Sequence, residues 1–204
     1  SYATGAVTGA GTYVGGLVGF NTKAISGSYT TGTVNGQQRT GGLAGENGGT
    51  ITNSYTTGAV TGNDYVGGLV GSNTNGGSIT NSYATAAVRG TGFYVGGLVG
   101  LLQAVNDYGS MVGWNDQGSI TNSYATGAVT GAQPGSGYVG GLVGSNADYS
   151  TITYSYWDIN TSGRTLSQGG TGKTTADMKL KGTYTGWDFN TIWDIVGSTN
   201  DGYP

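Results

Sequence analysis

The sequence repeats itself, and this internal period constrains the fold more than any other feature. The pair Ser-Tyr recurs at intervals of 26 to 28 residues in the first half of the chain, and again after longer steps. A second motif, Gly-Gly-Leu-Val-Gly, begins at Gly15, Gly67, Gly96 and Gly140, with the variant Gly-Gly-Leu-Ala-Gly at Gly41. A period of this length is typical of solenoids, in which each repeat buries its apolar residues against neighbouring repeats.

Each unit contains three short extended runs, I-T-N-S-Y, T-G-A-V and Y-V-G-G-L-V, bounded by residues that turns favour. No helical period occurs in residues 1–154. We therefore expect an all-β fold over residues 1–154, a β-solenoid (β-helix) of about six coils with ~26–28 residues per coil. An extra half-repeat near residues 101–118 copies the Y-V-G-G-L-V-G-x-N half-unit, and we expect it to form a duplicated half-coil.

Residues at the same phase of each unit are expected to stack in columns. The aromatic column comprises Tyr2, Tyr29, Tyr55, Tyr83, Tyr124 and Tyr156, and the amide column, at a turn, comprises Asn21, Asn47, Asn73, Asn115 and Asn146. Asn tolerates left-handed backbone and can hydrogen-bond to its copy in the next coil. Because the asparagines recur regularly, we favour a structural role, with sugar or metal binding as the alternative.

The Gly-Gly-Leu-Val run leaves one structural question open. Strict alternation along a strand cannot point both Leu17 and Val18 inward. Either the Gly-Gly step is a bulge, or this strand is buried on both faces.

The composition limits the chemistry available to the chain. Glycine supplies 44 of 204 residues and charged residues only 8%. With no Cys and no His, disulfides, Cys/His zinc sites, Cys nucleophiles and His general bases are excluded. The net charge of −3 leaves no basic surface for nucleic acid, and no apolar run is long enough for a membrane span. We expect no cofactor; extracellular calcium is the remaining option, although no Asp-x-Asp pair occurs.

Residues 155–204 lose the repeat and carry a set of large aromatic side chains: Trp157, Trp187, Phe189 and Trp193. Because an open solenoid end exposes unpaired strand edges, we expect this segment to be a mixed aromatic cap over the last coil. It should contain one short helix within residues 174–181, with Thr175 as N-cap and Gly182 as the stop. The alternative is an aromatic sugar-binding platform. The chain begins at Ser1 in mid-unit, so we expect earlier coils in a parent chain or another molecule stacked there.

The Y-V-G-G-L-V-G core resembles the GLUG motif, named for Gly-Leu-aliphatic-Gly and present here as Gly16-Leu17-Val18-Gly19 and its copies. The resemblance covers residues 1–154, and the tail from Ser155 is similar to sequence that often follows such repeats. It implies a large secreted or cell-surface bacterial protein, commonly adhesin-like. It implies no catalytic residue.

Two patterns resemble nucleotide-binding motifs only superficially. The segment Ser167–Thr174 ends in Gly-Lys-Thr like a phosphate-binding loop, but Ser167 stands where that loop needs glycine, and no βαβ pattern surrounds it. Residues 135–140 match a dinucleotide fingerprint that the sister repeats lack. We assign neither a ligand.

We therefore predict a non-enzymatic extracellular structural or adhesive module, such as a surface stalk, an adhesin or a component of a self-assembling fibre. Expected partners are cell-surface, matrix or carbohydrate ligands, or copies of the chain stacked end to end or laterally.

Two alternatives to this module stay open. Ice binding is suggested by a threonine row, Thr4, Thr31, Thr57, Thr85 and Thr126, although a second row of Thr8, Thr61 and Thr130 is interrupted by Asn35 and Arg89. A polysaccharide lyase or glycosidase would need two tail carboxylates, from Asp158, Asp177, Asp188 and Asp194, within ~5–10 Å.

Overall fold

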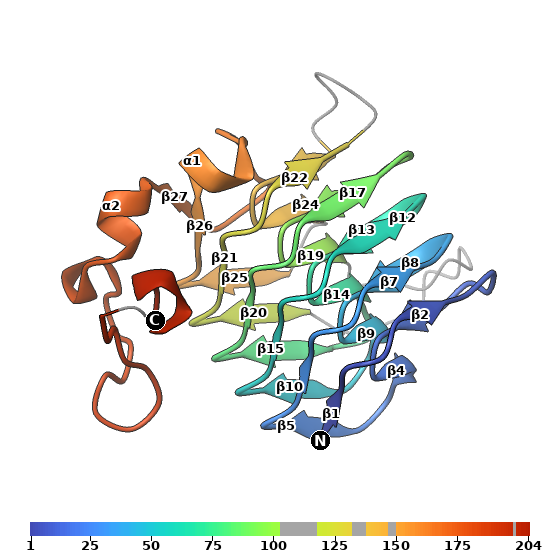
Figure 1. Ribbon diagram of the computed structural model, residues 1–204, viewed down its shortest axis with the longest axis horizontal. Coiled ribbons are helices and arrows are strands. Elements are labelled where there is room, and N and C mark those ends of the chain that lie inside the picture. The colour runs from blue at the N-terminus through green and yellow to red at the C-terminus, as the bar shows by residue number, and fades with distance from the viewer. Residues whose placement is uncertain (103–117, 132–137, 147–149, 198) are drawn as a thin grey trace.

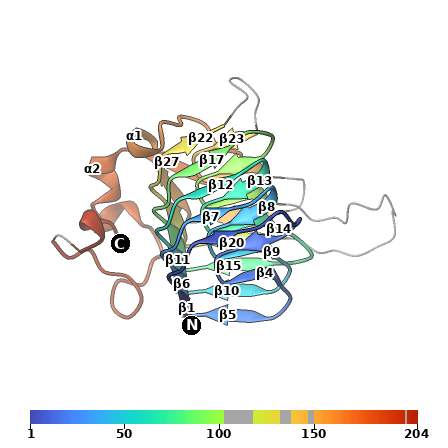
Figure 2. The ribbon, with the colours of Figure 1, turned by 45° about the vertical axis from the view of Figure 1, so that its right-hand side comes forward.

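The computed structural model describes residues 1–102, 118–131, 138–146, 150–197 and 199–204. Short parallel strands stack into five sheets that run side by side along one axis, and the chain passes through all five in each coil (Figures 1 and 2). Residues one coil apart pair in register, as Tyr2 does with Tyr29 and Asn47 with Asn73. The predicted β-solenoid is confirmed.

We name the sheets A to E in the order in which a coil visits them. Sheet A contains β1 (Tyr2–Ala3), β6 (Tyr29–Thr30), β11 (Tyr55–Thr56), β16 (Tyr83–Ala84), β21 (Tyr124–Ala125), β26 (Tyr156–Asp158) and β27 (Thr171–Lys173). Sheet B contains β2 (Val7–Thr8), β7 (Val34–Asn35), β12 (Val60–Gly62), β17 (Val88–Gly90) and β22 (Val129–Thr130). Sheet C contains β3 (Val14–Gly15), β8 (Gln38–Gly41), β13 (Asp64–Gly67), β18 (Val95–Gly96) and β23 (Val139–Gly140). Sheet D contains β4 (Val18–Asn21), β9 (Ala44–Asn47), β14 (Val70–Asn73), β19 (Val99–Leu102) and β24 (Val143–Asn146). Sheet E contains β5 (Ala24–Ser26), β10 (Thr50–Thr52), β15 (Ser78–Thr80), β20 (Ser119–Thr121) and β25 (Thr151–Thr153).

The stack has about five coils rather than six, because the chain leaves the coil path after the sixth Ser-Tyr pair opens β26. Among the described strands, β19 pairs directly with β14 and β24, and β20 pairs with β15 and β25. Residues 103–117 of the predicted duplicated half-coil lie outside the described residues.

Each coil also has five strands rather than the three predicted, and one of the additional breaks lies at the corner between sheets E and A. Asn53 and its copy Asn81 have φ values of 49° and 50°, which end the sheet E strand inside the I-T-N-S-Y run. The following serine is buried and closes the corner: the backbone N–H of Ser54 donates to Oγ of Ser82 at 3.2 Å, and Ser54 Oγ donates to the Thr52 carbonyl at 2.8 Å.

The second additional break falls at the Gly-Gly-Leu step, and it answers the question of the Leu-Val pair. Leu69 and Val70 are both fully buried in one core. Both backbone N–H groups donate to the carbonyl of Leu98, at 2.9 and 3.1 Å. Neighbouring coils nevertheless pair one to one on both sides of the step, Gly67 with Gly96 and Val70 with Val99, so no residue is inserted and the step is not a bulge. Strand β13 ends at Gly67 and β14 begins at Val70, and this break between two strands lets both side chains enter the same core.

The Gly-Gly pair forms a narrow waist between two cores. Valines of sheets B and C fill the smaller core, and Leu, Ile and Val of sheets D and E fill the larger one. At the waist Thr56 Oγ1 donates to the carbonyl of Gly68 at 2.6 Å. A Cβ on Gly68 would lie 2.2 Å from the carbonyl oxygen of Gly97, so the waist has no space for a side chain.

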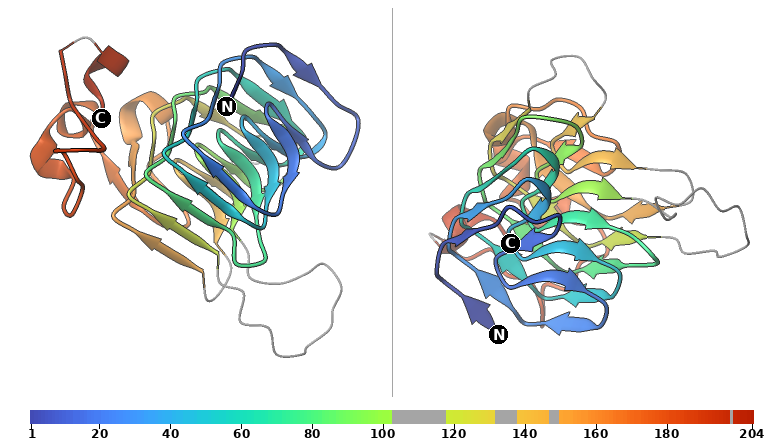
Figure 3. Two further views of the ribbon diagram at one scale, coloured as in Figure 1. Left: turned by 90° about the horizontal axis from the view of Figure 1, so that it is seen from below. Right: turned by 90° about the vertical axis from the view of Figure 1, so that its right-hand side faces the viewer.

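The C-terminal segment covers two surfaces, only one of which is the end of the solenoid. It contains α1 (Ile159–Ser162), α2 (Thr175–Met178), η1 (Lys181–Thr183) and η2 (Thr199–Gly202). At the end, Trp157 closes the larger core, and the carbonyl of Leu166 accepts from the Gly141 N–H at 3.0 Å. From α2 onward the chain lies along the flank, beside sheet A (Figures 1 and 3).

Trp187 and Trp193 are buried against the final coils, as expected, and Phe189 packs beside them, but the three lie along the flank rather than over the open end. Their rings pack instead with the tyrosines of sheet A, because that flank offers a broad apolar surface. The predicted helix is α2, but its N-cap is Thr174 rather than Thr175, and it ends at Met178 with Lys179 as C-cap rather than at Gly182. Thr174 has an extended backbone, and its Oγ1 accepts from the Asp177 N–H at 3.1 Å.

Candidate functional site

The aromatic column on sheet A contains five stacked rings. From Tyr2 through Tyr29, Tyr55 and Tyr83 to Tyr124, neighbouring ring centroids lie 4.9 to 5.3 Å apart with nearly parallel planes. Tyr156 keeps backbone register with Tyr124, but its ring packs edge-on against Tyr184 at 5.2 Å. The sixth position thus belongs to the C-terminal aromatic cluster.

The C-terminal segment covers this column unevenly along its length. Tyr2 is 66% exposed, whereas Tyr124 is fully buried. Burial, and to a smaller extent the neighbouring Tyr55, raises the pKa of Tyr83 to about 12. The Tyr83 phenol is therefore a neutral hydrogen-bond donor at ordinary pH. The first three rings of the column remain available to a partner.

The amide column is shorter than predicted. Asn21 Nδ2 donates to Asn47 Oδ1, and Asn47 Nδ2 donates to Asn73 Oδ1, each at 2.7 Å. The next position in register is Leu102, which pairs with both Asn73 and Asn146, so Asn146 is separated from the other amides. Asn115 lies outside the described residues.

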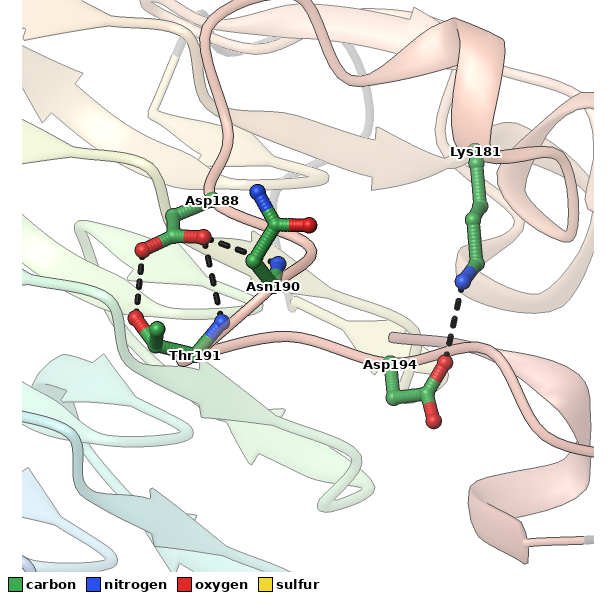
Figure 4. Close-up of polar contacts among 5 residues, drawn as sticks. All are labelled: Lys181, Asp188, Asn190, Thr191 and Asp194. Carbon is green, nitrogen blue, oxygen red and sulfur yellow. Dashed lines mark hydrogen bonds and ion pairs between the residues drawn. The ribbon is translucent and has the colours of Figure 1, made fainter.

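The carboxylates Asp188 and Asp194 each hold a local contact. Asp188 Oδ1 accepts from the backbone N–H of Asn190 at 2.8 Å and of Thr191 at 3.1 Å, and the Thr191 hydroxyl donates to Oδ2 (Figure 4). These hydrogen bonds, from the Thr191 hydroxyl first, lower the pKa of Asp188. Asp194 pairs with Lys181 at 3.0 Å.

Asp158 and Asp177 are also engaged in local structure. Asp158 is fully buried, caps α1 through Oδ1 and accepts from the Tyr203 hydroxyl at 2.7 Å through Oδ2. Asp177 Oδ2 accepts from the Thr174 hydroxyl at 2.7 Å. The phosphate-loop look-alike is also structural: Ser167 bonds to the Val143 backbone, and Thr171–Lys173 forms β27.

The threonine row on sheet A follows the same gradient of burial as the tyrosines. Thr31 and Thr57 are exposed, whereas Thr126 is buried beneath the C-terminal segment. The second row is broken in the register itself, because Thr61 pairs with Asn35 on one side and Arg89 on the other.

Sheet E carries two hydroxyl columns that the sequence analysis missed. One contains Thr50, Ser78, Ser119 and Thr151, and the other contains Ser26, Thr52, Thr80, Thr121 and Thr153. An inward isoleucine column separates them, as in Ile51, Ile79 and Ile120. In the sequence these columns are indicated by the T-I-T and S-I-T triplets that precede the Ser-Tyr pairs.

A second aromatic column at the start of sheet C was also missed. The Tyr65 and Tyr94 rings stack at 5.1 Å, and Tyr94 meets Tyr138 edge-on at 4.9 Å. In the second coil Arg39 replaces the tyrosine; its guanidinium lies 5.4 Å from the Tyr13 ring and 5.2 Å from the Tyr65 ring. The Tyr before each Val-Gly-Gly was the sequence signal.

Within the ranges given above, no cluster of three or more acidic, Cys or His side chains could hold a metal ion. No helix in the same ranges is long and apolar enough to cross a membrane.

Comparison with known proteins gives two findings. Residues 36–61, 62–89 and 135–158 match the family described as the GLUG motif. A crystal structure described as that of "a putative immunoglobulin A1 protease from Bacteroides ovatus" superposes with a TM-score of 0.55 and 23% identity, over 100% of this chain and 55% of that chain. At this identity the likeness shows the fold, and the chain spans only about half of that structure. No curated protein matches the chain significantly.

Proposed function

Because this chain carries repeats of the GLUG motif, we propose that it is a non-enzymatic, extracellular structural or adhesive module of a secreted or surface-attached bacterial protein. One observation carries the proposal: the solenoid presents the same side chains once per coil, at strand spacing, as in the stacked tyrosines of sheet A. A surface of this kind combines weak contacts with a repetitive partner through avidity. Cell surfaces, matrix polymers and copies of the chain all present such repeats.

The tail carboxylates support a non-enzymatic role. A glycosidase or lyase needs two groups in different protonation states facing one substrate. Here Asp158 is buried as a helix cap, Asp188 holds a turn and Asp194 pairs with Lys181. Each carboxylate thus has a structural partner of its own.

We expect the chain to adhere only when displayed in many copies. Beads coated with the chain should bind a mucin or collagen surface at least ~10²-fold more strongly than the soluble chain, because simultaneous contacts add. Retention under flow measures this, and beads coated with a single copy each are the matched control. Equal binding by single-copy and many-copy beads would contradict the avidity mechanism.

The purified soluble chain can also be assayed for catalysis. The substrates are a panel of polysaccharides and immunoglobulin A1, the protein after which the structural neighbour is named. Incubation with the chain should release no reducing ends and no peptide fragments. Turnover that disappears in Asp158→Asn or Asp188→Asn would replace the proposal with an enzyme.

Ice or ordered-surface binding is the second candidate, and sheet E now favours it more than the sheet A row does. The two hydroxyl columns contain no charged residue, and their members lie about 4.8 Å apart across strands and about 6.6 Å apart along them. Under this candidate the chain shows thermal hysteresis that Thr80→Lys abolishes and that the matched Thr61→Lys on sheet B leaves unchanged. Absence of hysteresis in the unaltered chain removes this candidate.

A further inference from the structure

A tight turn joins β14 to β15 at the corner between sheets D and E (Figure 1). Its two central residues, Asn75 and Gly76, have φ values of 51° and 74°, and the Gly77 N–H closes the turn by donating to the Thr74 carbonyl at 2.8 Å. Positive φ at both central positions is the type I′ geometry, for which Asn-Gly is the preferred sequence. Both central residues are exposed. The turn therefore presents an asparagine side chain and the glycine that follows it to water.

The two groups that react in asparagine deamidation are free at this turn. The attacking group is the backbone nitrogen of the following residue, and the Gly76 N–H donates no hydrogen bond to any described residue. The group that leaves is the side-chain amide, and Asn75 Nδ2 makes a single contact, to Thr74 Oγ1 at 3.3 Å. Glycine adds no side chain that would hinder the attack and lets the backbone rotate into it.

The chain has two other Asn-Gly pairs, and strand pairing protects both. Asn35 lies in β7, and the Gly36 N–H is held by a hydrogen bond of 2.9 Å to the next coil. Asn47 is fully buried, and the Gly48 N–H is held by a hydrogen bond of 2.8 Å to the preceding coil. At both pairs the attack requires that this hydrogen bond open first.

The asparagines at the corner between sheets E and A are protected in the same way. Asn53, Asn81 and Asn122 are each followed by a serine whose backbone N–H donates to a serine hydroxyl of the next coil, at 3.2 to 3.3 Å. Among the described Asn-Gly and Asn-Ser pairs, only Asn75 thus combines an exposed side chain with a free N–H on the next residue.

We propose that Asn75 is a site of spontaneous deamidation. The Gly76 nitrogen bonds to Cγ of Asn75, the Cγ–Nδ2 bond breaks, and ammonia leaves with the proton that the Gly76 nitrogen gives up. Water then opens the cyclic imide, either at the side-chain carbonyl, which gives aspartate, or at the main-chain carbonyl, which gives isoaspartate. The reaction consumes a water molecule, releases ammonia and needs no enzyme, cofactor or oxidant.

Deamidation changes both charge and hydrogen bonding at this corner. Asn75 Nδ2 donates to Thr74 Oγ1, and the Thr74 hydroxyl in turn donates to Glu46 Oε1 at 3.1 Å. A carboxylate at position 75 has no proton to donate, so it competes with Glu46 for the Thr74 hydroxyl and repels the Glu46 carboxylate. The added carboxylate takes the formal net charge from −3 to −4.

The test is incubation of the purified full chain at mildly alkaline pH, followed by peptide mapping in the mass spectrometer. In the folded chain Asn75 should convert at least about tenfold faster than Asn35 or Asn47, because their neighbouring nitrogens are held in ladder hydrogen bonds. The chain unfolded in urea is the matched control, since it keeps the sequence and removes the ladder. There the three rates should agree within about threefold.

Two variants identify the acidic product by ion exchange. Asn75→Gly removes the amide and places at φ of 51° a residue that tolerates it, so it should form no early acidic species. Asn75→Asp should elute with the acidic species of the incubated chain. A smaller ratio of rates in the folded chain, or an early acidic species that persists in Asn75→Gly, would overturn the proposal.

Discussion

Gly68→Ala should destabilise the solenoid by about 4 kcal/mol or more, an exceptional effect for the addition of one methyl group. The new Cβ would lie 2.2 Å from the Gly97 carbonyl oxygen and 2.9 Å from the Ala84 Cβ. Neither can move away easily, because the waist is held between two coils: the Gly68 carbonyl accepts from Thr56 Oγ1, and the Gly68 N–H donates to Gly96. The strain must therefore open the waist and disturb both adjacent cores.

Thermal unfolding followed by far-ultraviolet circular dichroism measures this effect. For a chain of this size a loss of about 4 kcal/mol corresponds to a fall in Tm of about 8–16 °C. Gly5→Ala is the matched control, because no heavy atom lies within 4 Å of a Cβ built there. If the Tm of Gly68→Ala equals that of Gly5→Ala, the backbone at the waist can move to make room for the methyl group.

The repeat phase predicted the stacking of the tyrosines, because identical backbone pairing in every coil leaves each copy opposite the last. It did not predict the number of strands. The breaks come from left-handed φ values at Asn53 and Asn81 and from the end of the strand at the Gly-Gly-Leu step, and both lie within runs of strand-forming residues.

The amide column shows why motif matching alone misplaces a residue. Asn115 stands in a good copy of the G-x-N half-unit, whereas Leu102 does not resemble asparagine. Register is decided by strand pairing, which places Leu102 between Asn73 and Asn146. Leu102 is fully buried among apolar side chains, so burial of a large aliphatic group replaces the amide contacts at that level.

The contact between the tail and sheet A could not be found from sequence. It joins Trp193 to Tyr83 and Tyr124, which are far apart in the chain and belong to the tail and to the repeats. Aromatic content predicted that the tail would be buried, but the choice between the end and the flank depends on which surface offers apolar area. Sheet A offers stacked tyrosines, and that is where Trp193 packs.

Trp187→Ala should release the C-terminal segment from sheet A while the repeats stay folded. Trp187 lies at the centre of the aromatic cluster, 4.4 Å from the Trp193 ring centroid, 4.5 Å from Tyr184 and 6.1 Å from Tyr124. Its Nε1 also donates to the Tyr154 carbonyl at 2.8 Å. Removing a buried tryptophan costs about 3–5 kcal/mol through lost burial and the cavity left behind.

The variant should lower the free energy of local opening of the C-terminal segment rather than the free energy of unfolding of the repeats. The aromatic cluster contacts the repeats mainly through the tyrosines of sheet A, and the two repeat cores do not include Trp187. Trypsin cleavage after Lys179 or Lys181 should therefore accelerate by about 10²-fold or more, in proportion to the open population. Hydrogen exchange at Ile51 and Ile79, in the larger core, should not change.

Leu180→Ala is the matched control, since Leu180 is 58% exposed and its truncation should cost less than about 0.5 kcal/mol. If Trp187→Ala instead speeds exchange at Ile51 and Ile79 as much as it speeds cleavage, the tail and the coils unfold as one cooperative unit, and the flank contact stabilises the whole solenoid.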